Sequence, residues 1–245
     1  MRAGPALRYR AVAELVGTAF LVAAVVGSGI AAQRLSPSDV GLQLLENAIA
    51  TGAALAALIV ALQPISAAFN PVITVLERLS GGLASRQAML IISAQIAGGM
   101  VGVVAANLMF SEPAVSLSTT ARGGPGVWLG EVIATAGLVL LIIALARGGR
   151  HQLIGWAVGA YITAGYWFTS STSFANPAVT IARMLSDTFA GIRPASVPMF
   201  LLAQAVGGLA GYGLSRAIYA PPDPAAITEE NPHELQPTDN PDSRR

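Results

Sequence analysis

Two short segments of this sequence carry the same motif, and each is too short to cross a membrane by itself. The two motifs are Asn70-Pro71-Val72 and Asn176-Pro177-Ala178. A threonine follows each motif two residues later, at Thr74 and at Thr180. Asparagine is a favoured helix N-cap, and proline is favoured at the first helical position. We therefore expect one short helix to begin after Asn70 and another after Asn176.

Long apolar segments surround both motifs. Hydrophobic residues make up 53% of the chain and charged residues only 11%, which is unlike an ordinary soluble domain. The runs 15–32 and 132–146 contain no charged side chain and are typical of membrane spans. We predict an all-α membrane protein with six spans and two half-helices. The predicted spans are 11–32, 41–62, 86–109, 127–146, 151–168 and 197–219, and the half-helices are 70–79 and 177–187.

The two halves of the chain repeat one another beyond the motifs. The segment 13–19 matches 130–136, and each copy has a glutamate at its second position. Because three spans per half is an odd number, the second half must enter the membrane from the opposite side. The sequence therefore predicts an inverted repeat, in which discontinuous helices meet near the membrane midplane.

The domain limits follow from this repeat. We expect a basic arm over 1–10, a channel domain over 11–219 with repeats at about 11–110 and 127–219, and a disordered tail over 220–245. The tail is rich in Pro, Asp, Glu and Asn and poor in apolar residues. More arginines fall on the side of the N-terminus than on the other side, so we expect both termini in the cytoplasm.

Paired Asn-Pro boxes, each opening a half-helix between membrane-length segments, resemble the aquaporin, or major intrinsic protein, family. The resemblance covers residues 8–219 and implies a passive channel in the inner (plasma) membrane, assembled as a homotetramer. It also implies that the six box residues form a central constriction. Two helix N-termini meeting there would repel cations and protons, while the asparagine amides would bind neutral solutes. Val72 departs from the alanine of the family's first box, and the sequence leaves open whether it repacks the half-helices or changes the pore shape.

Glu14 and Glu131 are carboxylates at equivalent places in the two repeats, each within an apolar span. A charge inside the membrane is costly and therefore usually has a role. Two roles are open. The carboxylates could accept hydrogen bonds from the loops that hold the half-helices, which is the role that the resemblance implies, or they could carry protons in a secondary transporter.

A selectivity filter is expected on the outer side of the central constriction. The family places an arginine directly after the second box, and Val179 stands there in this chain. The family's usual spacing puts the other filter positions at Ala50, Ala164 and Ser173, provided that there is no insertion. These residues would form a wide, weakly polar ring without an aromatic side chain or a fixed charge, which suits solutes larger than water.

Two charged residues could modify this outer region. Arg183 lies one helical turn beyond Val179 and could replace the missing arginine, or it could pair with Asp187 or cap the end of its helix. Glu46 precedes Ala50 by one turn and could face the outer vestibule, or it could be an interfacial carboxylate in the first turn of its helix.

The valine after the second box resembles a bacterial subgroup of aquaglyceroporins linked to arsenic resistance. That resemblance implies passage of arsenite as neutral As(OH)3, of methylated arsenicals, and of glycerol or other polyols, together with water. The alternatives are a strict water channel in which Arg183 acts as the filter arginine, a transporter that uses Glu14 and Glu131, and a non-conducting scaffold.

Other function classes find little support in the sequence. The net charge of +1 gives no reason to expect a nucleic-acid partner, and we expect none. The chain contains no cysteine and two histidines, and no nucleophile–base pair or metal-ligand cluster stands out. We therefore expect no enzymatic activity and no cofactor or metal.

Overall fold

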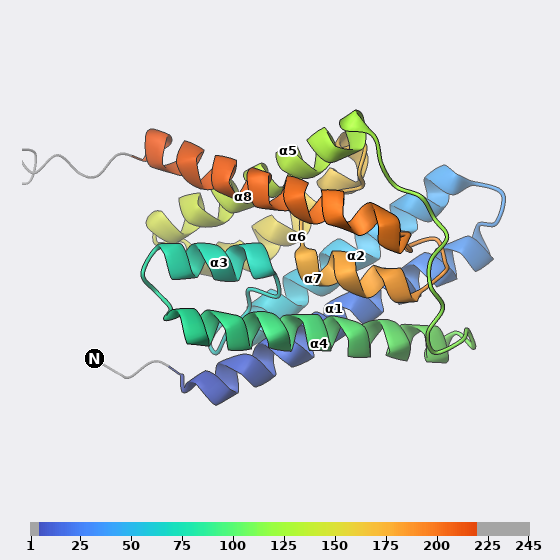
Figure 1. Ribbon diagram of the computed structural model, residues 1–245, viewed down its shortest axis with the longest axis horizontal. Coiled ribbons are helices and arrows are strands. Elements are labelled where there is room, and N and C mark those ends of the chain that lie inside the picture. The colour runs from blue at the N-terminus through green and yellow to red at the C-terminus, as the bar shows by residue number, and fades with distance from the viewer. Residues whose placement is uncertain (1–4, 220–245) are drawn as a thin grey trace, which may run out of the picture.

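The computed structural model describes residues 5–219, and within them it is entirely helical (Figure 1). The α-helices are α1 (Leu7–Leu35), α2 (Val40–Leu62), α3 (Pro71–Leu79), α4 (Ser85–Met109), α5 (Pro125–Arg147), α6 (Ile154–Phe168), α7 (Pro177–Ala182) and α8 (Val197–Ile218). Three 3-10 turns are η1 (His151–Leu153), η2 (Arg183–Leu185) and η3 (Pro194–Ser196).

Five of the described helices are long and apolar enough to cross a membrane: α1, α2, α4, α5 and α8. The helix α6 has 15 residues, fewer than the roughly 20 that a bilayer core requires. The span predicted over 151–168 is thus built from the turn η1 and the helix α6 together. The predicted all-helical membrane fold is confirmed.

The two halves pack in equivalent ways. In the first half α1 lies against α4 and α2, and in the second half α5 lies against α8 and α6. Glycines allow the closest approaches, because a Cβ on Gly98 of α4 would clash with the Leu15 carbonyl, and one on Gly207 of α8 would clash with the Val132 carbonyl. The pair α2 and α6 joins the two halves.

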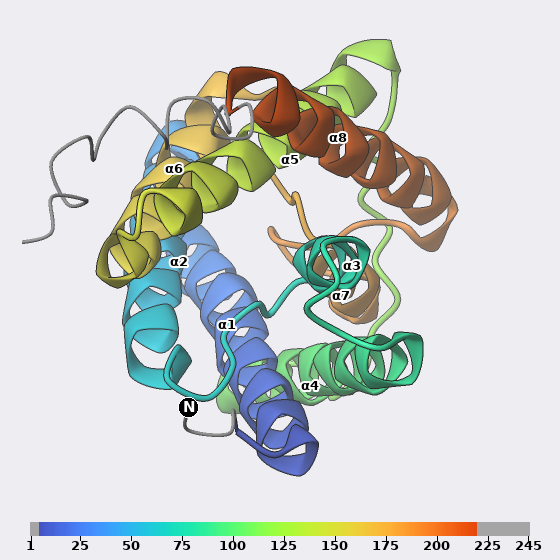
Figure 2. The same cartoon turned by 90° about the vertical axis from the view of Figure 1, so that its left-hand side faces the viewer.

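The two half-helices lie end to end in the middle of the bundle. In Figure 1 α3 and α7 lie in line between α4 and α8, and in the view turned by 90° they overlap (Figure 2). Each begins at its predicted cap: the Asn70 side chain accepts from the Val72 N–H at 3.0 Å, and that of Asn176 accepts from the Ala178 N–H at 3.0 Å. The second half-helix stops earlier than predicted, because α7 ends at Ala182 and only the turn η2 continues to Leu185.

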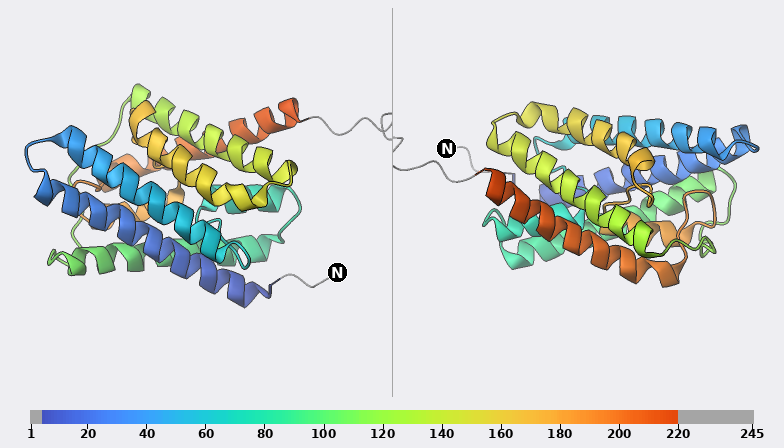
Figure 3. Two further views of the ribbon diagram at one scale, coloured as in Figure 1. Left: turned by 180° about the vertical axis from the view of Figure 1, so that it is seen from behind. Right: turned by 90° about the horizontal axis from the view of Figure 1, so that it is seen from above.

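The described chain begins and ends at one end of the molecule, where α1 starts and α8 finishes (Figure 3). The first helix starts at Leu7, inside the segment that was predicted to be a basic arm. The tail predicted over 220–245 lies outside the described residues.

Candidate functional site: a cavity at the junction of the half-helices

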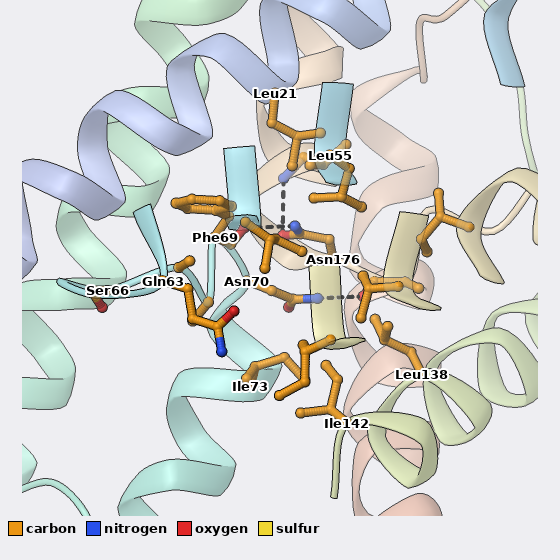
Figure 4. A pocket seen from close by; sticks show the side chains of 18 of the residues that line it. Leu21, Leu55, Gln63, Ser66, Phe69, Asn70, Ile73, Leu138, Ile142 and Asn176 are labelled. Carbon is orange, nitrogen blue, oxygen red and sulfur yellow. Dashed lines mark hydrogen bonds between the residues drawn. The ribbon is translucent and has the colours of Figure 1, made fainter. Parts of the chain in front are cut away.

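The two box asparagines join the half-helices by reciprocal hydrogen bonds (Figure 4). Asn70 Nδ2 donates to the Ala175 carbonyl at 2.8 Å, and Asn176 Nδ2 donates to the Phe69 carbonyl at 2.7 Å. Each asparagine therefore caps its own helix through Oδ1 and holds the loop before the other helix through Nδ2. The half-helix N-termini meet as the inverted repeat predicts.

The loop residues before the two boxes have an unfavourable backbone conformation. Phe69 has φ 48° and Ala175 has φ 45°, a left-handed region that a residue with a Cβ avoids. Such a conformation costs about 1–3 kcal/mol per residue and persists only where its surroundings impose it. Here each residue's N–H is bound by a buried carboxylate, Phe69 by Glu14 at 2.7 Å and Ala175 by Glu131 at 2.9 Å.

Glu14 is fully buried and accepts four hydrogen bonds. Besides Phe69 N–H, the donors are Ser66 Oγ at 2.6 Å, Ala68 N–H at 2.8 Å and Gln95 Nε2 at 2.8 Å. These are the contacts expected of a residue that supports the first half-helix. The carboxylate is not part of the cavity lining described below.

Glu131 supports the second half-helix in the same way. It is fully buried and accepts from Phe174 N–H at 2.9 Å, from Ala175 N–H at 2.9 Å and from Gln204 Nε2 at 2.6 Å. Gln204 also donates to Thr180 in α7, at 2.9 Å. In the first half Gln95 donates to Thr74 in α3 at the same distance, so the repeat extends to the hydrogen bonds.

A cavity of about 560 Å³ runs past the asparagine pair. Apolar side chains of the long helices line much of it: Leu21, Leu55, Ile59, Leu138, Ile142, Val158 and Ile162. The half-helices and their caps contribute Asn70, Ile73 and Asn176 (Figure 4). Val179 of α7 also lines the cavity. At the end nearest the start of α1, which we call the inner mouth, polar and charged residues line the cavity: Arg10, Gln63, Glu77 and His151.

The opposite end, which we call the outer end, differs from the sequence prediction. Ser173 and Val179 line the cavity as predicted, but Ala50 and Ala164 do not. Their places are taken by Thr51, the lining residue of α2 farthest from the inner mouth along that helix, and by Tyr166, its counterpart on α6. The Tyr166 hydroxyl donates to Thr51 Oγ1 at 3.2 Å.

Helix phase explains this correction. On α6, Ile162 and Tyr166 are four residues apart and share the face that meets the cavity, whereas Ala164 lies two residues from each, on the opposite and exposed face. On α2, Ala50 is one residue, or about 100° of rotation, away from Thr51. The prediction of a ring without an aromatic side chain is therefore wrong for this cavity. The periodic apolar face of α6 could have revealed Tyr166.

The hydroxyl of Ser173 is buried at the same end. Its side chain is 3% exposed, and Oγ has no hydrogen-bond partner among the described residues. Ser173 lines the cavity together with Thr51, Tyr166 and Val179, although its Oγ is itself buried.

Of the six box residues, the two asparagines line this cavity and the other four do not; those four are Pro71, Val72, Pro177 and Ala178. Val72 packs against α8, where a Cβ on Gly208 would lie 2.7 Å from Val72 Cγ1. Val72 is therefore accommodated by a glycine behind the half-helix and is not part of the cavity lining.

Arg183 also lies behind the wall. Its side chain is 3% exposed, its guanidinium carbon lies 3.5 Å from the centre of the Phe174 ring, and Nε donates to the Ala190 carbonyl. The predicted ion pair with Asp187 is wrong, since Asp187 instead accepts from Thr119 N–H at 2.8 Å. Arg183 follows the last residue of α7, but its side chain does not bond the carbonyls of that helix.

Glu46 lies outside the cavity lining. It is the seventh residue of α2 rather than part of its first turn, and Oε1 accepts from Ser36 Oγ at 2.8 Å. Glu46 is therefore not in the first turn of its helix, and its place in an outer vestibule stays a prediction.

Sequence reasoning missed Arg122, which lies in the loop between α4 and α5. This arginine is half-buried, and the partial loss of solvent around its guanidinium lowers the pKa of that group below the usual value. Its Nε donates to the Gly191 carbonyl at 2.9 Å, its Nη2 donates to the Phe189 carbonyl at 3.1 Å, and it lies 5.3 Å from the Phe174 ring centre. Nothing in the local sequence distinguishes it from an exposed loop arginine.

Comparison with known proteins identifies the family. The family model described as "Major intrinsic protein" matches residues 4–173. This chain is a member of the major intrinsic protein family. It is 47% identical over 219 residues to the aquaglyceroporin AqpS of Rhizobium meliloti (strain 1021), covering 89% of this chain and 93% of that protein. It is 32% identical to the probable aquaporin NIP7-1 of Arabidopsis thaliana, covering 84% of this chain and 75% of that protein.

The fold agrees with this membership. The X-ray structure of the aquaglyceroporin from Plasmodium falciparum superposes with a TM-score of 0.66 at 16% identity, covering 87% of this chain and 97% of that one. As a major intrinsic protein, the chain is an integral membrane channel for small solutes, and its two Asn-Pro boxes and paired half-helices are those of the aquaporin fold.

Proposed function

We propose that this protein is a passive channel for small neutral solutes that excludes protons and ions. The proposed solutes are arsenite as As(OH)3, methylated arsenicals, glycerol and related polyols, and water. We also propose that it lies in the inner membrane with both termini in the cytoplasm and assembles as a homotetramer. The aquaglyceroporin name of its Rhizobium relative supports the class of solute.

The observation that carries the proposal is Val179. It stands three residues after Asn176, where the family places a filter arginine, and it lines the cavity with an apolar side chain. An arginine there would add both bulk and a fixed charge. Without an arginine at this position, the passage has room for a solute larger than water. The apolar surface of that solute also does not have to pass a fixed charge.

The cavity wall suits a solute that has both apolar and polar surfaces. Apolar side chains from the long helices form one side, and the two asparagines lie on the other. A polyol can place its C–H groups against the first and its hydroxyls against the second. The positive ends of α3 and α7 meet at the asparagines and disfavour a cation there.

The outer end is the proposed selectivity region. Thr51, Tyr166 and Ser173, each with a hydroxyl group, lie at one end of the cavity, and the buried Ser173 Oγ has no hydrogen-bond partner among residues 5–219. Hydroxyls both donate and accept, which matches the hydroxyls of As(OH)3 and glycerol. The four proposed filter residues are Thr51, Tyr166, Ser173 and Val179.

A strict water channel is the second candidate, because Tyr166 adds a bulky side chain at this end and bonds to Thr51. Proton-coupled transport has less support. Glu14 and Glu131 lie outside the cavity lining and are occupied by N–H and hydroxyl donors.

Flux into proteoliposomes separates these functions. We expect glycerol and arsenite to enter down their gradients well above the rate of protein-free vesicles, and we expect a protonophore to leave the rates unchanged. Water flux without solute flux would favour the strict water channel. Loss of solute uptake on adding the protonophore would favour the transporter.

A further inference from the structure

The inverted repeat gives each residue of one half-helix a counterpart in the other. Ile73 is the third residue after Asn70, and Val179 is the third residue after Asn176. Both line the cavity, so equivalent positions of α3 and α7 face the same passage from its two ends. Positions one turn further along each half-helix are then also equivalent.

These next positions carry opposite charges. Glu77 is the seventh residue after Asn70, and Arg183 is the seventh after Asn176. Glu77 lines the inner mouth and is neutralised by Arg10, whose Nη2 lies 2.9 Å and 3.0 Å from its two carboxylate oxygens. The charge of Glu77 at the inner mouth is therefore balanced by that of Arg10.

Arg183 has no such neutralising partner. Within residues 5–219 neither Arg183 nor Arg122 forms an ion pair. Both are held by the neutral carbonyls of 189–191, and both guanidinium groups lie against the Phe174 ring, at 3.5 Å and 5.3 Å from its centre. Phe174 is itself among the cavity-lining residues. One buried positive charge, that of Arg183, and one half-buried positive charge, that of Arg122, thus lie behind one side chain of the cavity wall.

The carboxylate of Glu131, which lies near these arginines, does not remove the difference in charge between the two ends of the passage. Glu131 bonds the Phe174 N–H at 2.9 Å, but Glu14 occupies the equivalent place in the first half. A feature that both halves share cannot distinguish the two mouths. The difference comes from Arg183 and Arg122 on one side and the neutralised pair of Glu77 and Arg10 on the other.

We propose that Arg183, together with Arg122, is the barrier to cations at the outer end of this channel and takes the charge role that Val179 cannot fill. A charge that is buried in a medium of low dielectric constant, as that of Arg183 is, and that forms no ion pair among the described residues acts over several ångströms. The Phe174 ring separates the two arginines from the passage, so they repel a cation without narrowing the path of a neutral solute. This inference rests on the proposed function.

The test compares cation leak with neutral flux in proteoliposomes. Arg183→Met removes the charge, and Arg183→Lys keeps it while losing the planar stack on Phe174. We expect Arg183→Met to raise sodium and proton leak on the order of ten-fold and Arg183→Lys to stay near the native value. Glycerol permeability should change little in both. Arg34→Met is the matched control, since it removes an exposed arginine that is paired with Glu112 at 2.7 Å.

The outcomes separate the two proposals. Native leak in a folded Arg183→Met protein would overturn the barrier, and so would equal leak in the lysine and methionine variants. If Arg183→Met does not fold, Arg122→Met against Arg122→Lys decides on the same criterion. A native protein that carries no glycerol would refute the proposed function, while the difference in ion leak between the variants would still report on the barrier.

Discussion

The Tyr166 hydroxyl donates to Thr51 Oγ1 at 3.2 Å and links α6 to α2 at the outer end of the cavity. Both side chains are buried, at 4% and 2% exposed. They are the last residues of their helices, counted away from the inner mouth, to line the cavity. An aromatic ring and two bonded hydroxyls therefore lie where the lining of this cavity ends on α2 and α6.

Tyr166→Ala should widen this end of the channel. The substitution removes the ring and its hydrogen bond, so we expect permeability to polyols longer than glycerol to rise more than permeability to water. Light scattering in a series of polyols measures the change. Ala164→His is the control: that residue is on the exposed face of α6, and its substitution should leave the series unchanged. If Ala164→His reduces solute flux and Tyr166→Ala has no effect, the filter residue on α6 is Ala164, as the spacing in the sequence predicted.

Glu14→Ala should destabilise the folded protein rather than change whether solute flux depends on a proton gradient. The substitution leaves the Ser66 hydroxyl and the N–H groups of Ala68 and Phe69 without this acceptor and leaves Gln95 Nε2 with Thr74 alone, and each hydrogen bond to a charged group contributes about 1.5–3 kcal/mol. We expect a lower unfolding temperature in detergent and a reduced yield of folded protein. Glu14→Gln, which keeps one acceptor oxygen, should be milder. Native stability with abolished solute flux would instead point to a transport role of the carboxylate.

Gly208→Ala should destabilise the packing of α8 on the first half-helix. The added Cβ would lie 2.7 Å from Val72 Cγ1, and overpacking of this kind costs about 1–3 kcal/mol. Val72→Ala should be tolerated better in the Gly208→Ala background than in the native protein. A double-mutant cycle of unfolding temperatures measures this coupling. Additive effects would mean that the two residues do not share the space.

Much of this architecture could be predicted from the sequence because its causes are local or repeated. Asparagine followed by proline specifies a helix start, so the ends of α3 and α7 that meet are correctly placed. The glutamates were found because the repeat places them in equivalent apolar spans. These features depend on residue type and on the inverted symmetry, and both can be counted along the chain.

The outer end could not be predicted in the same way. Counting from Asn176 back to α6 assumes a fixed length for the loop between them, and an error of two residues moves the position from one face of the helix to the other. Arg122 depends on a different cause. Arg122 is half-buried because the loop after α4 pairs with the segment after α7, for example through Arg193 N–H and the Thr120 carbonyl at 2.7 Å. Such long-range contacts leave no periodic signal.

The most direct test of the account is the ratio of glycerol to water permeability in proteoliposomes that carry the native protein or Val179→Arg. An arginine at this cavity-lining position adds bulk and a charge at the outer end, so we expect glycerol and arsenite flux to fall about ten-fold or more while water flux falls less. Val179→Leu adds bulk without charge and should lower the ratio by a smaller amount. An unchanged ratio in folded Val179→Arg protein would contradict the account, because the solute path would then not pass Val179.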